Sequence, residues 1–290
     1  MHSTQSADTC GFCYVANTAA YLAEALLSIT SLKHHMPEAR VCVIAPAALQ
    51  QPHPLIADWR APTLGDKTPI VKNDATLAPY DRVVFVDTDT RFLAPMMDVF
   101  PILDGFDLAA AHEPTRGWDY PTPAPAAFCE LNTGVLVFKN TPKIREFFGF
   151  WLNEYRRLMA EQNLRNDQPA FRNALWLNPS IRLATLPPEF HCIIGKPVSL
   201  AWEARLIHDR GSNLTFVNAE LNRTVGYRAF LPGLGSFFPF CGRRQWIRQW
   251  GRLSANWLLV LINPNRLKGS ARQAKPHQWH LGETPAEKKS

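Results

Sequence analysis

The chain has 290 residues, of which 46% are hydrophobic and 19% charged, enough for one large α/β domain with its own core. No apolar run approaches the ~20 residues of a membrane-spanning helix. The polar start, Met1 to Thr9, lacks a signal-peptide pattern, so a cytoplasmic location is expected. The net charge of +6 is uneven, because residues from Arg243 onward include ten basic and two acidic side chains, against 21 and 23 elsewhere. The nearly neutral body argues against a nucleic-acid-binding domain.

The first ninety residues alternate between apolar runs and a helical pattern. Residues 11–16 predict a buried strand, the next two residues can cap a helix, and residues 41–45 predict a second strand. A strand, a helix and a strand within roughly 35 residues form a βαβ unit, which implies a parallel sheet covered on both faces. A third strand at 83–86 runs directly into Asp87-Thr88-Asp89.

Strands and helices continue to alternate further along the chain. Residues 105–111 and 131–138 predict strands, separated by a proline-rich surface loop at 114–125. Helices are expected after Thr141 and after Asp167, with these residues as N-caps. The pattern predicts an α/β fold with a doubly wound, mostly parallel sheet and helices on both faces.

Beyond Phe237 the periodicity fades into a basic, tryptophan-containing tail. We therefore divide the chain into a domain at 1–240 and a C-terminal extension at 241–290. The extension alternates arginines with tryptophans, which favours either a peripheral contact with an anionic membrane or a basic helix packed on the domain or on a partner subunit.

Asp87 and Asp89 are the strongest candidates for chemistry. They lie beyond the carboxyl end of an apolar strand, where ligands bind in open α/β sheets. Two carboxylates at this spacing can share one hard cation, whose other positions a diphosphate fills. Such a cation stabilises the charge that builds on a nucleotide diphosphate when a sugar leaves it. Alone, the motif fits an ordinary polar turn equally well.

The run from Tyr80 to Thr90 resembles the metal strand of A-type (GT-A) nucleotide-sugar glycosyltransferases. The opening at 16–32 looks like that of the retaining glycogenin and lipopolysaccharide galactosyltransferase group, in which the first strand-to-helix loop holds the nucleotide. The resemblance implies that Asn17 and Tyr21 contact the base, with core packing as the alternative for Tyr21. It covers residues 11 to about 211.

Two further matches follow in the order of that family. The strand at 131–138 resembles its Asn-x-Gly strand, which implies that Asn132 contacts the donor sugar or the acceptor and that Gly134 leaves room for it. Asn166-Asp167-Gln168 resembles the segment that meets donor-sugar hydroxyls. We therefore assign Asp167 and Gln168 as the catalytic residues, with an ordinary N-cap role as the alternative for Asp167.

His208 lies in a sequence, residues 206–211, that resembles the family's His-x-x-Gly. The resemblance implies that this histidine joins the two aspartates as a metal ligand, and an imidazole suits Mn²⁺ better than Mg²⁺. The family's next element, Lys-Pro-Trp, is missing here, because residues 212–214 are Ser-Asn-Leu. The basic residues left to hold the diphosphate are Lys67, Lys72 and Arg210.

The resemblance implies transfer of a hexosyl unit from a nucleotide sugar, with UDP-sugar as the expected donor, to a hydroxyl of a carbohydrate or lipid-linked glycan acceptor. It also implies retention of configuration, Mn²⁺ or Mg²⁺ as cofactor, and Thr88 in the donor site. An inverting enzyme would instead need a general base. The candidates for that base are Asp119, Glu130, Asp167 and Glu189.

Two rival functions remain open from the sequence. One is a binding or scaffold module derived from such a transferase. The other is a haloacid-dehalogenase phosphatase, whose motif would carry Thr or Val where Arg91 stands.

Overall fold

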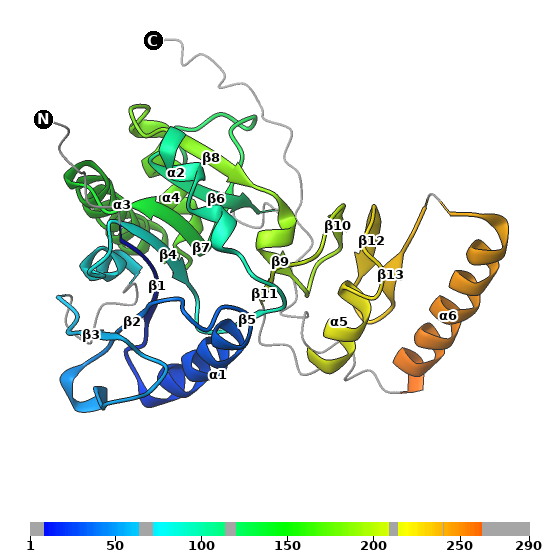
Figure 1. The fold of residues 1–290 in the computed structure, drawn as a ribbon. Coiled ribbons are helices and arrows are strands. Elements are labelled where there is room, and N and C mark those ends of the chain that lie inside the picture. The colour runs from blue at the N-terminus through cyan, green and yellow to red at the C-terminus, as the bar shows by residue number, and fades with distance from the viewer. Residues whose placement is uncertain (1–8, 64–71, 114–119, 209–213, 240, 263–290) are drawn as a thin grey trace, which may run out of the picture.

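The computed structural model describes residues 9–63, 72–113, 120–208, 214–239 and 241–262. Within these ranges the chain forms a seven-stranded sheet, two three-stranded sheets and six α-helices (Figure 1).

The seven-stranded sheet has the strand order β3-β2-β1-β4-β7-β6-β8. Every strand runs parallel to the others except β7, which is antiparallel to both β4 and β6. The prediction of a mostly parallel sheet is therefore confirmed, with one reversed strand at its centre. The strands are β1 (Cys10–Val15), β2 (Val41–Ile44), β3 (Asp58–Arg60), β4 (Arg82–Val86), β6 (Leu108–His112), β7 (Leu131–Lys139) and β8 (Leu183–Leu186).

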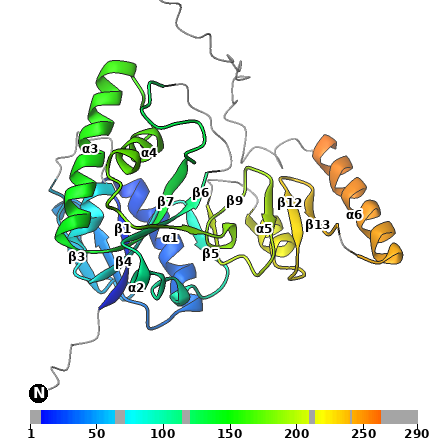
Figure 2. The ribbon, with the colours of Figure 1, turned by 90° about the horizontal axis from the view of Figure 1, so that it is seen from above.

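Helices cover both faces of this sheet, as predicted (Figure 2). The helices are α1 (Ala19–His35) and α2 (Ile102–Gly105) on one face, and α3 (Pro142–Gln162) and α4 (Gln168–Leu177) on the other. Strand β1 explains the unbroken apolar run: Phe12 and Tyr14 pack toward α1, whereas Cys13 and Val15 pack toward α3 and α4. The predicted strand at 105–111 begins only at Leu108, because Gly105 ends α2.

The helix starts follow the capping residues in two cases of three. Thr18 accepts a hydrogen bond from the Tyr21 amide, and Thr141 accepts one from the Ile144 amide. Asp167 precedes α4 but its side chain makes no capping hydrogen bond, so the N-cap alternative is wrong for its carboxylate. Asn166 Oδ1 accepts from the Gln168 amide at 2.8 Å instead, which leaves the Asp167 carboxylate for other contacts.

The remaining strands form two small sheets beside the large one (Figure 1). The first contains β5 (Thr90–Phe92), β11 (Leu206–His208) and β9 (Cys192–Ile193). The second contains β10 (Val198–Leu200), β12 (Arg228–Leu231) and β13 (Gly235–Phe237), with α5 (Leu214–Leu221) and α6 (Arg243–Ile262) against it.

Beyond Phe237, where we expected the periodicity to fade, the chain forms helix α6, and a basic helix was one alternative for the extension. Trp246, Trp250, Leu253, Trp257 and Val260 recur at helical spacing, and the rings of Trp246 and Trp250 pack on Phe237. Other large apolar side chains of the helix, such as Ile247 and Leu258, are exposed. Among the described residues, no helix has both the length and the hydropathy that crossing a membrane requires.

Candidate metal and donor site

The candidate site lies where three strands of the large sheet meet. The carboxyl ends of the parallel neighbours β1 and β4 share one edge, and the antiparallel β7 begins at the same edge. The Asp87 amide donates to the Gly134 carbonyl at 2.8 Å, which joins the Asp-x-Asp turn to the Asn-x-Gly segment. Two of the sequence matches are thus direct neighbours in space.

His208 reaches the same place from the first small sheet. Strand β11 pairs antiparallel with β5, and His208 lies opposite Thr90 in that pairing. Its Nε2 lies 3.1 Å from Asp89 Oδ1 and 3.7 Å from Asp87 Oδ2. One ligand atom from each of these three residues lies within 4.8 Å of the other two, so the structure brings the predicted metal-ligand group together. Two carboxylates and an imidazole suit a divalent cation such as Mn²⁺.

A buried chain of hydroxyl groups holds the turn that carries the aspartates. Thr90 Oγ1 donates to the Asp87 carbonyl at 2.8 Å and lies 2.7 Å from Ser28 Oγ. Ser28 Oγ in turn lies 3.0 Å from the Tyr14 hydroxyl. Ser28 and Thr90 are fully buried. Because buried hydroxyls are costly to leave unpaired, this chain fixes the turn relative to α1 and β1.

Lys72 is the first residue of the 3-10 helix Lys72–Leu77 and forms ion pairs with two carboxylates of the site. Its Nζ lies 3.1 Å from Asp87 Oδ2 and 3.3 Å from Asp167 Oδ2. It also donates to the side-chain oxygen of Thr133 at 3.1 Å. Burial lowers the pKa of Lys72, but the charges of Asp167 and Asp87 outweigh burial and raise it, so the ammonium stays charged.

Asp167 belongs to the site, although it does not cap α4. Its Oδ2 accepts from Thr133 Oγ1 at 3.0 Å, and its carbonyl accepts from the Trp151 indole at 3.1 Å. Through Lys72 it is joined to Asp87. The structure therefore brings a predicted catalytic residue next to the predicted metal group.

Gly134 is explained by a different neighbour from the one that we expected. The resemblance implied that a side chain here would block the donor sugar. In the structure, a Cβ at this position would overlap the imidazole of His208 and press on Asn132 Oδ1. The glycine thus makes room for the histidine of the metal group.

Glu113 is a site residue that the sequence reasoning missed. It is 2% exposed, and its Oε2 accepts from Asn132 Nδ2 at 2.9 Å and from Gln168 Nε2 at 3.4 Å. Lys196 Nζ forms an ion pair with its Oε1. The available signal was position, because Glu113 directly follows β6, a strand parallel to β4. Asn132 and Gln168 are themselves largely buried, so Glu113 anchors both of these predicted residues.

His191 is the second missed residue. It ends the short 3-10 helix Pro188–Phe190 and is 3% exposed. Its Nε2 lies 2.6 Å from His208 Nδ1, and the two rings are nearly parallel, with centroids 4.8 Å apart. Burial, and then the charge of His208, hold the pKa of His191 well below its usual range, so this imidazole is neutral. Sequence offered no signal beyond a histidine after two prolines.

The predicted base-binding residues lie at the same edge of the sheet. Asn17 follows β1 and is partly exposed. Tyr21 is 40% exposed, so the alternative of core packing is wrong. Thr88 is buried, and its hydroxyl donates to Glu24 of α1, so it supports the turn that carries the aspartates.

Three predicted residues, Lys67, Asp119 and Arg210, fall outside the described residues, as does half of the loop expected at 114–125. Glu189 accepts from the amides of Ala201 and Trp202, at 2.6 and 3.0 Å, and is 2% exposed. A carboxylate engaged in this way closes a loop and is poorly placed as a general base.

No protein-family model matches the chain, and no curated protein matches it. Among solved structures, the chain is similar to one described as the apo structure of the bifunctional glycosyltransferase WbbM, with 15% sequence identity and a TM-score of 0.48. The match covers 73% of this chain and 47% of that one, so this chain spans about half of the length of that protein. At this identity and TM-score the likeness carries no information about activity.

Proposed function

We propose that the protein is a metal-dependent glycosyltransferase that uses a nucleotide-diphosphate sugar. The observation that supports this most is the meeting of Asp87, Asp89 and His208 at the carboxyl end of β4. These residues come from segments more than a hundred positions apart, and their ligand atoms converge beside the loop that follows β1. That edge of an open α/β sheet is where such folds bind nucleotides.

The three residues would hold Mn²⁺ or Mg²⁺, which would supply a positive charge to the departing diphosphate. Lys72 holds the Asp87 and Asp167 carboxylates in place, and so limits their mutual repulsion. Asn17 and the exposed ring of Tyr21 would receive the base, for which we propose uracil. Asn132, Gln168 and Asp167 would line the sugar position, with Glu113 orienting the first two.

The transferred unit would be a hexose, with retention of configuration. A mechanism without a general base is favoured because Glu189 accepts from backbone amides, Asp167 pairs with Lys72, and Glu130 is 2% exposed. Positioning and electrostatic stabilisation would then carry most of the catalysis.

The proposed acceptor is a carbohydrate or a lipid-linked glycan in polysaccharide biosynthesis, reached at the inner face of a membrane. Helix α6 motivates this, because it carries four arginines and no acidic residue, and exposes tryptophans beside them. Arginines attract anionic lipid, and indoles favour the interface. Arg248→Glu should weaken binding to phosphatidylglycerol vesicles, whereas Arg156→Glu on α3 should not. Equal binding by both variants, or none by the wild type, would exclude the membrane contact.

A nucleotide-sugar-binding module without catalysis is the second candidate. It shares the same site, so turnover separates the two functions. A phosphatase is less well supported, because Asp87 is held by Lys72 and faces His208, whereas a nucleophilic aspartate must be free to attack phosphorus.

The test is isothermal titration of UDP and of GDP, with and without Mn²⁺, into the wild type and Asp89→Ala. Metal-dependent UDP binding that is lost in the variant would support the donor site, and turnover of UDP-sugars would then separate enzyme from binding module. If neither nucleotide binds with Mn²⁺ present, the proposed function is wrong.

A further inference from the structure

His191 contacts His208, the histidine of the proposed metal-ligand group. It is not one of the metal-ligand residues, and the function proposed above gives it no role. Yet its imidazole touches that of His208 more closely than any other side chain does among the contacts of the described residues. The role of His191 depends on which nitrogen atoms the two rings present to each other.

The two nitrogens of His208 face in different directions. Nε2 faces the carboxylates of Asp87 and Asp89, and Nδ1 faces His191 Nε2 at 2.6 Å. A histidine that binds a metal through Nε2 needs its lone pair there, so its hydrogen must be on Nδ1. That hydrogen then points at His191 Nε2, which must accept it.

The backbone holds this contact from both sides. His191 directly precedes β9, which is the parallel neighbour of β11, and His208 is the last residue of β11. The His191 amide donates to the Pro188 carbonyl at 3.0 Å, and the Arg205 amide donates to the Glu189 carbonyl at 2.7 Å. The 3-10 helix that carries His191 is thus bonded to the start of the strand that carries His208.

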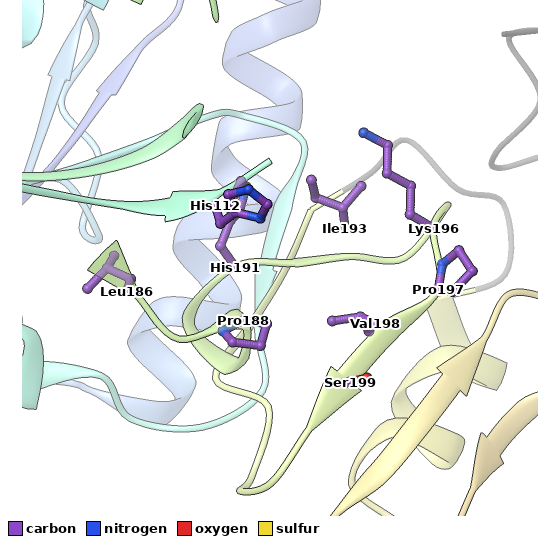
Figure 3. A pocket seen from close by; sticks show the side chains of 9 residues that line it. All are labelled: His112, Leu186, Pro188, His191, Ile193, Lys196, Pro197, Val198 and Ser199. Atoms are coloured by element: carbon purple, nitrogen blue, oxygen red, sulfur yellow. The ribbon is translucent and has the colours of Figure 1, made fainter. Parts of the chain in front are cut away.

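His191 lines a cavity of about 310 Å³ (Figure 3). Its Nδ1 is buried and has no hydrogen-bond partner among the described residues. If Nε2 accepts from His208, then Nδ1 carries the hydrogen. Lys196 and Ser199 line the same cavity, as does the exposed His112.

We propose that His191 is a positioning residue for the metal site: it accepts a hydrogen bond from His208 Nδ1, and so holds Nε2 toward the two aspartates as a lone-pair donor. This rests on the proposed function, since it requires a metal at His208. Partners of this kind fix the ring and tautomer of a metal-binding histidine, and their loss typically weakens metal affinity by about 10–100-fold.

The test measures Mn²⁺ affinity from the free-ion signal in electron paramagnetic resonance, without nucleotide, so that it does not depend on activity. His191→Phe keeps a ring in the space but removes both nitrogens, and affinity should fall by about 10–100-fold. His191→Gln can place an oxygen near Nε2 and should restore most of the affinity. His112→Phe is the matched control, because it changes a histidine of the same cavity that forms no hydrogen bond or ring contact with His208 among the described residues, and it should bind Mn²⁺ like the wild type.

A second readout follows nitrogen coordination in the bound state. Spin-echo modulation from ¹⁴N should be present in the wild type and in His191→Gln, and should be weakened in His191→Phe. If His191→Phe fails to fold when its metal-free unfolding is compared with that of the wild type, His191→Met takes its place as the apolar variant.

The outcomes separate the two proposals. If the wild type binds no Mn²⁺, the proposed function fails and this inference falls with it. If the wild type binds Mn²⁺ but the apolar variant keeps the same affinity and the same ¹⁴N modulation, only the role of His191 is refuted. Equal losses in His191→Phe and His112→Phe would also refute it, because the effect would then belong to the cavity in general.

Discussion

The large sheet with its site and the C-terminal part with α6 differ in how completely their apolar side chains are buried. In the sheet, apolar side chains are buried on both faces, and the charged groups at its edge are matched with one another. In α6, Trp250 and Trp257 are 51% and 53% exposed, and Ile262 is 79% exposed. Few residues of that helix are buried, and polar bonds such as Gln249 to Phe238 attach it to the second small sheet.

This difference shows where the structure constrains function. A side chain at the sheet edge cannot move without unpairing a buried charge or opening the core, so the ligand atoms stay aligned. The exposed apolar side chains of α6 mark a surface for contact with something else, although the rings of Trp246 and Trp250 also pack on Phe237. Substitutions at the site and in α6 should therefore differ in their effects on binding and on stability.

Removing a metal carboxylate should have the largest effect. In Asp89→Ala the cation loses one of three protein ligands, and the partner of His208 Nε2 is gone. We expect metal-dependent nucleotide binding and turnover to fall by about 100-fold or more. Asp98 is an exposed aspartate nearby in sequence. Asp98→Ala is therefore the control, and its nucleotide binding and turnover should match those of the wild type.

Gly134→Ala should disturb the site through sterics alone. The added methyl group would overlap the His208 imidazole, so either the ring moves or the strand does. We expect unfolding free energy to fall by roughly 1–3 kcal/mol, together with weaker Mn²⁺ binding. Gly149→Ala on α3 is the matched control, because its Cβ meets nothing within 4 Å. It should raise helix stability by about 0.5–1 kcal/mol, as measured by chemical denaturation. If Gly134→Ala left both the free energy of unfolding and Mn²⁺ binding unchanged, the His208 ring would not be tightly packed against position 134.

The sequence was informative where a single segment determines the outcome. The strand before Asp87 and the cap at Thr18 are local, and apolar runs with capping residues predict them. The direction of β7 was not predictable, because an apolar run is the same in either direction. Glu113 and His191 were missed because their importance comes from neighbours such as Asn132 and His208, which only the folded chain brings close.

Lys72→Met should destabilise the site by charge. Without the ammonium, Asp87 and Asp167 would face each other partly buried and uncompensated. Because these side chains keep some exposure, we expect a loss of roughly 1–3 kcal/mol, below the 3–5 kcal/mol typical of a fully buried pair. Saturating Mn²⁺ should recover part of this loss, because a cation at Asp87 compensates the same charge. Thermal unfolding with and without Mn²⁺ measures both effects, and an equal loss in both conditions would contradict a metal at Asp87.

Asp107 offers a smaller, pH-dependent test at the opposite end of β6 from the site. Burial raises the pKa of Asp107, but hydrogen bonds from Lys143 and from the Arg182 amide outweigh it, and the pKa lies below its ordinary value of 3.8. The stabilisation is therefore complete above the unfolded-state pKa and is lost as pH falls through the folded-state pKa. Lys143 is 42% exposed, so Asp107→Asn should cost about 1 kcal/mol or less at pH 7.

The same comparison at acidic pH checks the sign. The difference between wild type and Asp107→Asn should shrink as pH falls below 4. Asp104→Asn, whose carboxylate is 68% exposed, is the control and should change stability little at either pH. A difference that grew toward acid would mean that the Asp107 carboxylate is not stabilised by its partners.

Substituting an exposed leucine of α6 should give the smallest change in the free energy of unfolding. Such a result would distinguish this helix from the large sheet, where side chains are buried. Leu258 is 54% exposed, so Leu258→Ser should change the free energy of unfolding by less than about 0.5 kcal/mol. Leu253, on the buried side of the same helix and 8% exposed, is the matched position, and Leu253→Ala should cost about 2–4 kcal/mol. If Leu258→Ser were as costly as Leu253→Ala, its side chain would be covered in solution, and α6 would be part of a packed interface. A neutral result leaves the exposed face free for the membrane contact proposed above.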